Sequence, residues 1–352
     1  MIVSTGKLLK TYMISNGITI AALARESGVS PKTIYLVLSD EGKLNARIAS
    51  AVEKLIPGLS ALFLVKYDAQ YQLEKKQFML ENGISNPEST LKTFGIKDIV
   101  DETDDQVEMV KIAFAIFGKD NVMKKQFDLS DLSPSFSLAK NEQYESVVKW
   151  VRLAYYEYSN SQNNDLLVFD ETEFDRLFPI LKQLCKTDSF SLSISNMKRF
   201  CAASGINFYF KKSLRNSRVK GVVLKNKEGK LFVFVSDLFK RLDLLWLAFI
   251  HEMIHIKNGD YNVVNLNREE NEINVNKEVF DYFNGEDISR DFNVLLAKNS
   301  SKKDAIIYLA GKYDIAVGIV ATLLADKYNL YKEAEVTNLF TRIKDSELCS
   351  CF

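Results

Sequence analysis

The spacing of hydrophobic and polar residues predicts helices over most of this chain. Apolar side chains recur every three or four positions, which is the repeat that gives an α-helix one buried face. This spacing is found in residues 4–16, 45–56, 60–76, 142–158 and 174–184. We therefore expect a mainly α, multidomain protein.

Strand patterning is concentrated in one stretch of the second half. Residues 208–210, 219–224 and 231–235 are rich in β-branched and aromatic side chains, which favour strands. Residues 226–229 (NKEG) separate the last two runs and are typical of a hairpin turn. The pattern predicts a small sheet.

The first 58 residues contain a more specific pattern. Short helices are predicted around Leu23 and Ile34, with Gly28 at the turn between them. Ser30 and Pro31 indicate a helix start, because serine can cap free backbone N–H groups and proline has none to lose. Two helices joined by a tight turn form a helix-turn-helix bundle, and this segment resembles the Xre/HigA-like repressors.

The resemblance to these repressors implies a DNA operator as a partner. Ser30 would lie at the start of the recognition helix, and Lys32, Thr33 and Tyr35 would face outward from it. Residues 1–58 contain seven basic and four acidic side chains, a balance of +3 that is compatible with phosphate contacts. The alternative is a helical domain of the same shape that serves only oligomerisation, and a homodimer is compatible with both.

The chain contains two histidines, His251 and His255, and both fall in one HExxH pattern. Positions i and i+4 of a helix share a face, so both imidazoles can reach one metal ion. Glu252 beside the first histidine can act as a general base toward water. Residues 241–250 are apolar and Gly259 marks a helix stop, so the motif would extend a buried helix. An HExxH also occurs in helices whose histidines only pack or face solvent.

A third metal ligand is expected from an acidic segment downstream. A catalytic zinc usually has three protein ligands and one open position. With no third histidine, the remaining ligand would be a carboxylate or a cysteine, or there is none. Residues 267–284 predict an amphipathic helix, in which Glu272 is our candidate and Glu269 the alternative. These acids could instead serve only the helix N-terminus, where the helix dipole favours negative charge. The apolar positions of this helix are Ile273, Val275, Val279, Phe280 and Phe283.

Together these segments resemble the ImmA/IrrE family of metallopeptidases. LLWLAFIHEMIHI, a spacer and ExxVNxxV are similar to the family's apolar run into HExxH and its following Glu-x-x-Ala-(Asn/Asp)-x-x-Ala helix. Glu272 falls on the family's ligand glutamate and Asn276 on its polar position. Val275 and Val279 replace alanines, a departure that affects helix packing more than chemistry.

The family resemblance implies an α+β zincin-like metallopeptidase domain with a small sheet. His251, His255 and Glu272 would bind Zn²⁺, and Glu252 would be the catalytic residue. The implied activity is limited cleavage of a specific repressor or antitoxin-type protein, in stress response or mobile-element control. The alternative is a HigA-like regulator or antitoxin whose zinc domain senses metal or binds a partner, with little peptidase activity. The same ligands also accept manganese or iron.

We expect four regions along the chain, in keeping with its length of 352 residues. They are a helix-turn-helix DNA-binding domain with its following helix over 1–80, a helical linker over 81–185, the metallopeptidase domain over 186–345, and a flexible tail over 346–352.

Charge and hydropathy exclude some function classes. The net charge is zero, so there is no overall attraction to nucleic acid or membrane. No apolar run reaches 18 residues and the start does not resemble a signal peptide, which predicts a soluble cytoplasmic protein without a membrane partner. Cys185 and Cys201 are expected to be small buried hydrophobes, and Cys349 and Cys351 to lie reduced in the tail.

Overall fold

The structure is a computed structural model that describes residues 3–96, 105–130, 132, 144–161, 166–214, 216–261, 263–264, 270–344 and 347, with the backbone alone for 263–264 and 270–272. It is mainly helical, with 65% helix and a small mixed sheet, as expected for a mainly α protein with a small sheet. The chain divides into two compact units, Met1–Phe127 and Asp128–Phe352. The division falls inside the predicted linker, so residues 81–127 belong to the first unit and 128–185 to the second.

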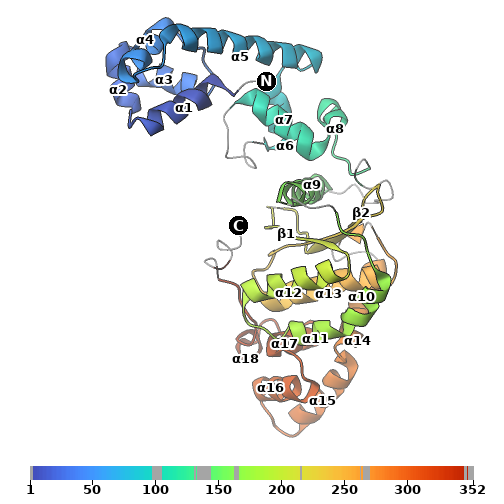
Figure 1. Cartoon of the computed structure of the whole chain (residues 1–352). Helices are drawn as coiled ribbons and strands as arrows, with labels where there is room; N and C mark the ends of the chain where they lie inside the picture. The colour runs from blue at the N-terminus through green and yellow to red at the C-terminus, as the bar shows by residue number, and fades with distance from the viewer. Residues whose placement is uncertain are drawn as a thin grey trace. The chain divides into compact units, whose positions relative to one another are not determined.

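The first unit is a helical bundle (Figure 1). Its core is formed by fully buried side chains that include Leu9, Leu23, Ile34, Ile48 and Leu64. A separate aromatic cluster joins Phe94, Phe117 and Phe127 later in the unit. The helices are α1 (Thr5–Ser15), α2 (Ile20–Ser27), α3 (Pro31–Leu38), α4 (Ala46–Leu55), α5 (Ala61–Glu81), α6 (Pro87–Phe94), α7 (Gln106–Phe117) and α8 (Lys119–Lys124).

The turn between α2 and α3 follows the local sequence. Gly28 has φ of +63°, a left-handed conformation that glycine adopts without steric cost. Ser30 caps α3, because its side chain accepts the Thr33 N–H at 3.2 Å, and Pro31 is the first helical residue. The predicted helix start at Ser30 and Pro31 is confirmed.

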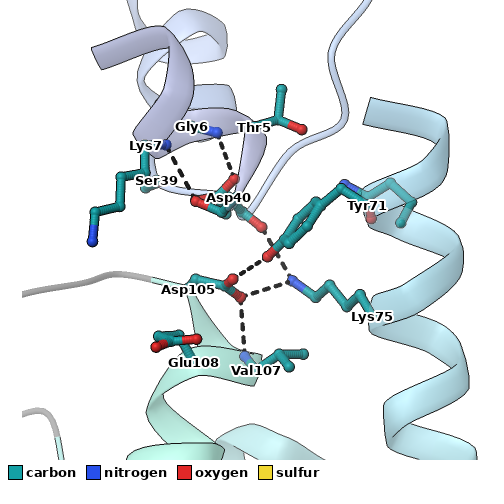
Figure 2. A network of polar contacts seen from close by, with 12 residues as sticks. Thr5, Gly6, Lys7, Ser39, Asp40, Tyr71, Lys75, Asp105, Val107 and Glu108 are labelled. Carbon is teal, nitrogen blue, oxygen red and sulfur yellow. Dashed lines mark hydrogen bonds and ion pairs between the residues drawn. The ribbon is translucent and has the colours of Figure 1, made fainter. Parts of the chain in front are cut away.

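A buried carboxylate closes the far end of α3. Asp40 has φ of +58°, and its Oδ2 accepts the Ser4 hydroxyl at 2.5 Å. Its Oδ1 accepts the Gly6 N–H at 2.7 Å (Figure 2). Burial raises the pKa of the Asp40 carboxyl above its ordinary range, and the Ser4 hydrogen bond opposes this. A Cβ on Gly6 would meet the carbonyl of Leu38, so glycine permits the close approach of α1 to the end of α3.

The same network reaches α5 and α7. Lys75 Nζ donates to the Asp40 backbone oxygen at 3.4 Å and lies 3.7 Å from Asp105 Oδ1 (Figure 2). The Tyr71 hydroxyl donates to Asp105, which also caps α7 by accepting the Val107 N–H. The sequence indicated a solvated loop or a helix N-terminus for the acidic run at 101–105. Asp105 is at the helix N-terminus but is 4% exposed, and the other three acids of the run lie outside the described residues.

The second unit is built on a small sheet. The strands are β1 (Asn207–Phe210), β2 (Gly221–Lys225), β3 (Leu231–Val235) and the two-residue β4 (Val263–Val264), in the order β1-β3-β2-β4. β1 runs parallel to β3, and β2 is antiparallel to both β3 and β4. The predicted hairpin between β2 and β3 is confirmed.

Helices cover both faces of this sheet (Figure 1). On one face, Tyr155 and Tyr158 of α9 (Tyr144–Ser161) contact the Phe232 ring. On the other, Phe249 of α13 (Leu242–Lys257) contacts Phe208, and α12 (Phe190–Ala203) contributes Phe190. The remaining elements are α10 (Glu171–Leu177), η2 (Phe178–Ile180), α11 (Leu181–Leu184), α14 (Glu270–Tyr282), α15 (Gly285–Ala297), α16 (Lys302–Tyr313), α17 (Val317–Tyr328) and α18 (Ala334–Thr337).

Some sequence-based expectations need correction. The helix predicted over 174–184 is interrupted by η2, where Pro179 lacks the N–H that would continue an α-helix. Ile273 was expected on the buried face of its helix but is 66% exposed. Cys185 and Cys201 are buried and free, as predicted, whereas Cys349 and Cys351 lie outside the described residues, as does the tail over 346–352 except for residue 347.

Across the described part of the chain, no single helix has the length and apolar character to cross a membrane. α16 and α17 meet that criterion only as a pair bent by 120°.

Candidate metal centre

The HExxH pattern lies in a helix that is buried nearly all round. Leu245, Phe249 and Met253 of α13 are at most 2% exposed, as the apolar run before the motif predicts. The start of the helix is fixed by Asp243, which accepts the Thr322 hydroxyl at 2.5 Å and the Thr341 N–H at 3.1 Å. The helix ends at Lys257 with Asn258 as its C-cap, and Gly259 follows with φ of +72°, so the predicted stop is confirmed. The motif is thus held on a rigid element.

The two histidines point their Nε2 atoms at each other. His251 Nε2 and His255 Nε2 are 3.0 Å apart, and the rings are 2% and 0% exposed. The Asn276 Oδ1 atom lies 3.1 Å from His251 Nδ1. Because an amide oxygen only accepts, the His251 proton belongs on Nδ1 and its Nε2 carries a lone pair.

The second ring has a similar arrangement at a longer distance. The Asp260 carboxylate lies 3.9 Å from His255 Nδ1, which favours a proton on that atom and a lone pair on Nε2. Two facing lone pairs suit a shared cation. Tetrahedral zinc with Zn–N bonds of about 2.05 Å would separate the nitrogens by about 3.3 Å, so the observed 3.0 Å needs a shift of only a few tenths of an ångström.

Glu252 is fully buried against the sheet. Its side chain is 0% exposed. A Cβ built on Gly221, the first residue of β2, would lie 2.5 Å from Glu252 Oε1 and 2.8 Å from its Cδ. Any larger residue at this position would therefore force the Glu252 side chain to shift, and Gly221 is a part of the site that sequence analysis missed.

Of the predicted third ligand, Glu272, the structure describes only the backbone. Glu272 falls in α14 one helical turn before Asn276, but its side chain is outside the described atoms, and Glu269 is outside the described residues. Where side chains are described, His, Cys, Asp and Glu do not gather in a group of three that could hold a metal ion. The structure thus brings together His251, His255 and Asn276, and Glu272 stays a prediction.

A cavity of about 500 Å³ adjoins this centre. It opens between α13, α14 and α17, and His251 and Asn276 form part of its wall. Its other walls combine apolar side chains, among them Leu247, Val279 and Leu323, with charged ones: Lys220, Glu286, Asp326 and Lys327. A ligand in this cavity would lie directly beside the histidine pair.

The predicted DNA-contact residues lie in the first unit. Ser30, Lys32, Thr33 and Tyr35 are all exposed, and the Tyr35 side chain is 57% exposed. Ser30 Oγ also lies 2.9 Å from the Thr33 hydroxyl, so its first role is to cap α3. Lys32 and Tyr35 are the side chains that this surface offers most freely to a partner.

Comparisons of the chain with protein-family models, with curated proteins and with solved structures found no match.

Proposed function

We propose that this chain is a regulatory zinc endopeptidase joined to a DNA-binding module, and that it cleaves a specific repressor or antitoxin-type protein. The observation that carries the proposal is the 3.0 Å separation of His251 Nε2 and His255 Nε2 on the helix that also holds Glu252. A pair of buried imidazoles oriented in this way suits a metal better than it suits packing alone.

Each residue of the centre has a distinct role in this proposal. His251 and His255 would hold the zinc ion together with Glu272, and Asn276 would orient His251 by accepting its Nδ1 proton. When bound, zinc supplies a Lewis acid that polarises a carbonyl and makes water more acidic. The Glu252 carboxylate would accept a proton from the water that attacks the peptide carbonyl, and would then pass this proton to the leaving amine.

The DNA-binding part of the proposal rests on α2 and α3. The two helices are joined by a tight turn at Gly28, and α3 presents Lys32, Thr33 and Tyr35 at the surface. Helix-turn-helix proteins place such a helix in the major groove, with its first residues toward the bases. Binding would bring the peptidase to a regulated site on DNA.

One observation favours a second candidate function. Glu252 is 0% exposed, whereas a catalytic base must reach its substrate water. A zinc centre that senses metal or binds a partner, within a HigA-like regulator or antitoxin, does not need an accessible Glu252. A movement on substrate binding that exposes Glu252 to the cavity beside His251 would make its burial compatible with catalysis.

The experiment compares the wild-type chain with Glu252→Gln and with the control Glu278→Gln, an exposed acid on α14. Each is co-expressed with repressor or antitoxin-type proteins encoded beside its gene, and all chains are weighed by mass spectrometry. We expect wild type and control to cut one protein at one site, and Glu252→Gln to keep zinc without cutting. Zinc binding without cleavage by any form would favour the second candidate. Cleavage by Glu252→Gln at the wild-type rate would exclude Glu252 as the base.

A further inference from the structure

The wall of the cavity beside His251 combines apolar side chains with charged ones that have partners within the protein. Lys220 Nζ lies 5.9 Å from the centroid of the Phe239 ring. Lys327 Nζ lies 2.8 Å from Glu286 Oε2, and Asp326 accepts the Tyr331 hydroxyl. The walls between them come from Leu247, Ala248, Val279, Phe280 and Leu323. Its volume of about 500 Å³ exceeds that of a single large side chain. The cavity is therefore suited to a bulky apolar group.

A second cavity, of about 530 Å³, lies at the other end of α13. The rings of Phe239, Tyr331 and Phe340 form its walls, and the charged residues that line it are Lys240, Arg241 and Arg342. The Arg241 guanidinium is paired with Asp243 and lies 3.5 Å from the Phe340 ring centroid, so it is part of the scaffold. Arg342 is exposed. The positive, aromatic character of this cavity suits an acidic side chain.

The two cavities adjoin along α13, and we refer to them together as the groove along α13. Leu244 lines both of them, and it also lines a small hollow between them that Lys220 and Ala248 share with the first cavity. His251 and Arg241 are ten residues apart, which corresponds to about 15 Å along a helix at 1.5 Å per residue. An extended peptide at about 3.3 Å per residue covers this length with four or five residues.

We propose that the groove along α13 binds an extended peptide segment, with a bulky apolar side chain beside His251 and an acidic side chain four or five positions away at Arg342. This inference deepens the proposed function and rests on it only in naming the segment as part of the protein substrate. The substrate class is then proteins that carry a bulky apolar and an acidic residue, four or five positions apart, in a flexible segment.

The test measures peptide binding without turnover. Full-length chain carrying Glu252→Gln is titrated into fluorescent peptides that hold one Phe and one Glu, four or five positions apart and in both orders, on a Gly/Ser background. We expect one order to bind and Phe→Ser to weaken it about tenfold or more, from the lost apolar burial. Glu→Lys should weaken binding about two- to fivefold, as expected for a partly exposed ion pair.

A charge reversal on the protein distinguishes specific binding in this groove from nonspecific peptide binding. Adding Arg342→Glu should invert the preference, so that the Lys peptide binds better than the Glu peptide. Lys344→Glu, at an exposed position two residues further on, is the matched control and should leave the preference unchanged. Equal binding of the Phe and Ser peptides, or a preference that Arg342→Glu does not alter, would overturn the inference.

The outcomes also distinguish this inference from the proposed function. If the chain binds the peptides selectively but holds no zinc and cleaves nothing, the peptide-binding groove is supported and the proposed peptidase function is contradicted. If the wild-type chain cleaves its substrate but peptide binding depends on neither the Phe nor the Glu, the peptidase function is supported and the peptide-binding groove is contradicted.

Discussion

A β-carbon on Gly221 would lie 2.5 Å from Oε1 of Glu252, so the first residue of β2 and the candidate catalytic base occupy adjoining space. The contact is one of several between the sheet and α13. It explains why a glycine begins a strand whose next three residues, Val222, Val223 and Leu224, are apolar.

Replacing Gly221 by alanine should therefore destabilise the second unit by about 1–3 kcal/mol, the usual cost of overpacking a core. It should also lower cleavage, because the Glu252 carboxylate must move. The measurement is denaturant unfolding followed by tryptophan fluorescence, since Trp150 and Trp246 both lie in this unit. Gly311→Ala in α16 is the control, with open space around its Cβ and an expected change of at most about 1 kcal/mol in the stabilising direction. A Gly221→Ala chain as stable as wild type would mean that the contact is not tight.

Asn276 should act as a positioning residue for the metal centre. Removing its side chain with Asn276→Ala takes away the acceptor for His251 Nδ1, and we expect zinc affinity to fall about 10- to 100-fold. Asn276→Asp keeps an acceptor and should retain most of the affinity. Competition with a coloured chelator measures both. Equal zinc affinity in Asn276→Ala would show that His251 needs no support from α14.

Asp40 should make the first unit less stable as pH rises. Burial raises the pKa of its carboxyl above the ordinary 3.8, so the folded state favours the protonated form. The stability that this gives is fully present below pH 3.8 and is lost as pH rises through the folded-state pKa.

Asp40→Asn stays neutral at every pH, can still accept the Gly6 N–H, and tolerates the positive φ. The variant should be more stable than wild type at pH 7, and the gain should shrink as the pH approaches 3.8. Helical ellipticity follows both units, whereas tryptophan fluorescence follows only the second. An unfolding transition seen by ellipticity alone therefore belongs to the first unit, which holds neither tryptophan. Glu53→Gln, at an exposed position, should show almost no such dependence. A gain that grows toward low pH would contradict the assigned direction.

The surface of α3 should carry DNA affinity if the first unit reads an operator. Duplexes selected from a random library by the full chain provide the probe. Lys32→Ala should weaken binding to all of them and reduce the salt dependence by about one counterion. Lys66→Ala, at an exposed position on α5, is the control. Failure to select any duplex would favour the alternative in which this bundle serves only oligomerisation.

Much of the local structure could be predicted because the relevant signals are local. Ser30 with Pro31 marks the start of α3, residues 226–229 form the hairpin turn, and Gly259 ends α13. The HExxH spacing also predicts that His251 and His255 share a helix face, and their Nε2 atoms do face each other.

The missed features depend on residues that are distant in sequence. Gly221 and Glu252 are 31 positions apart, and nothing near either one signals their contact. For Asp105 the sequence indicated a solvated loop or a helix N-terminus. Asp105 does cap α7, but its burial beside Tyr71 and Lys75 of α5 was not predicted. Ile273 was assigned to the buried face because the helical repeat identifies the apolar face of a helix. The repeat does not say which positions on that face another element covers.

Zinc bound per chain, measured by elemental analysis after dialysis against trace zinc, tests the metal centre most directly. Wild-type chain should hold one zinc ion, and His251→Ala, His255→Ala and Glu272→Ala should each lose most of it while remaining folded. Zinc retained only by Glu272→Ala would transfer the third-ligand role to Glu269 or Glu270. Wild-type chain without zinc, or full zinc retention in both histidine variants, would contradict the proposed metal centre.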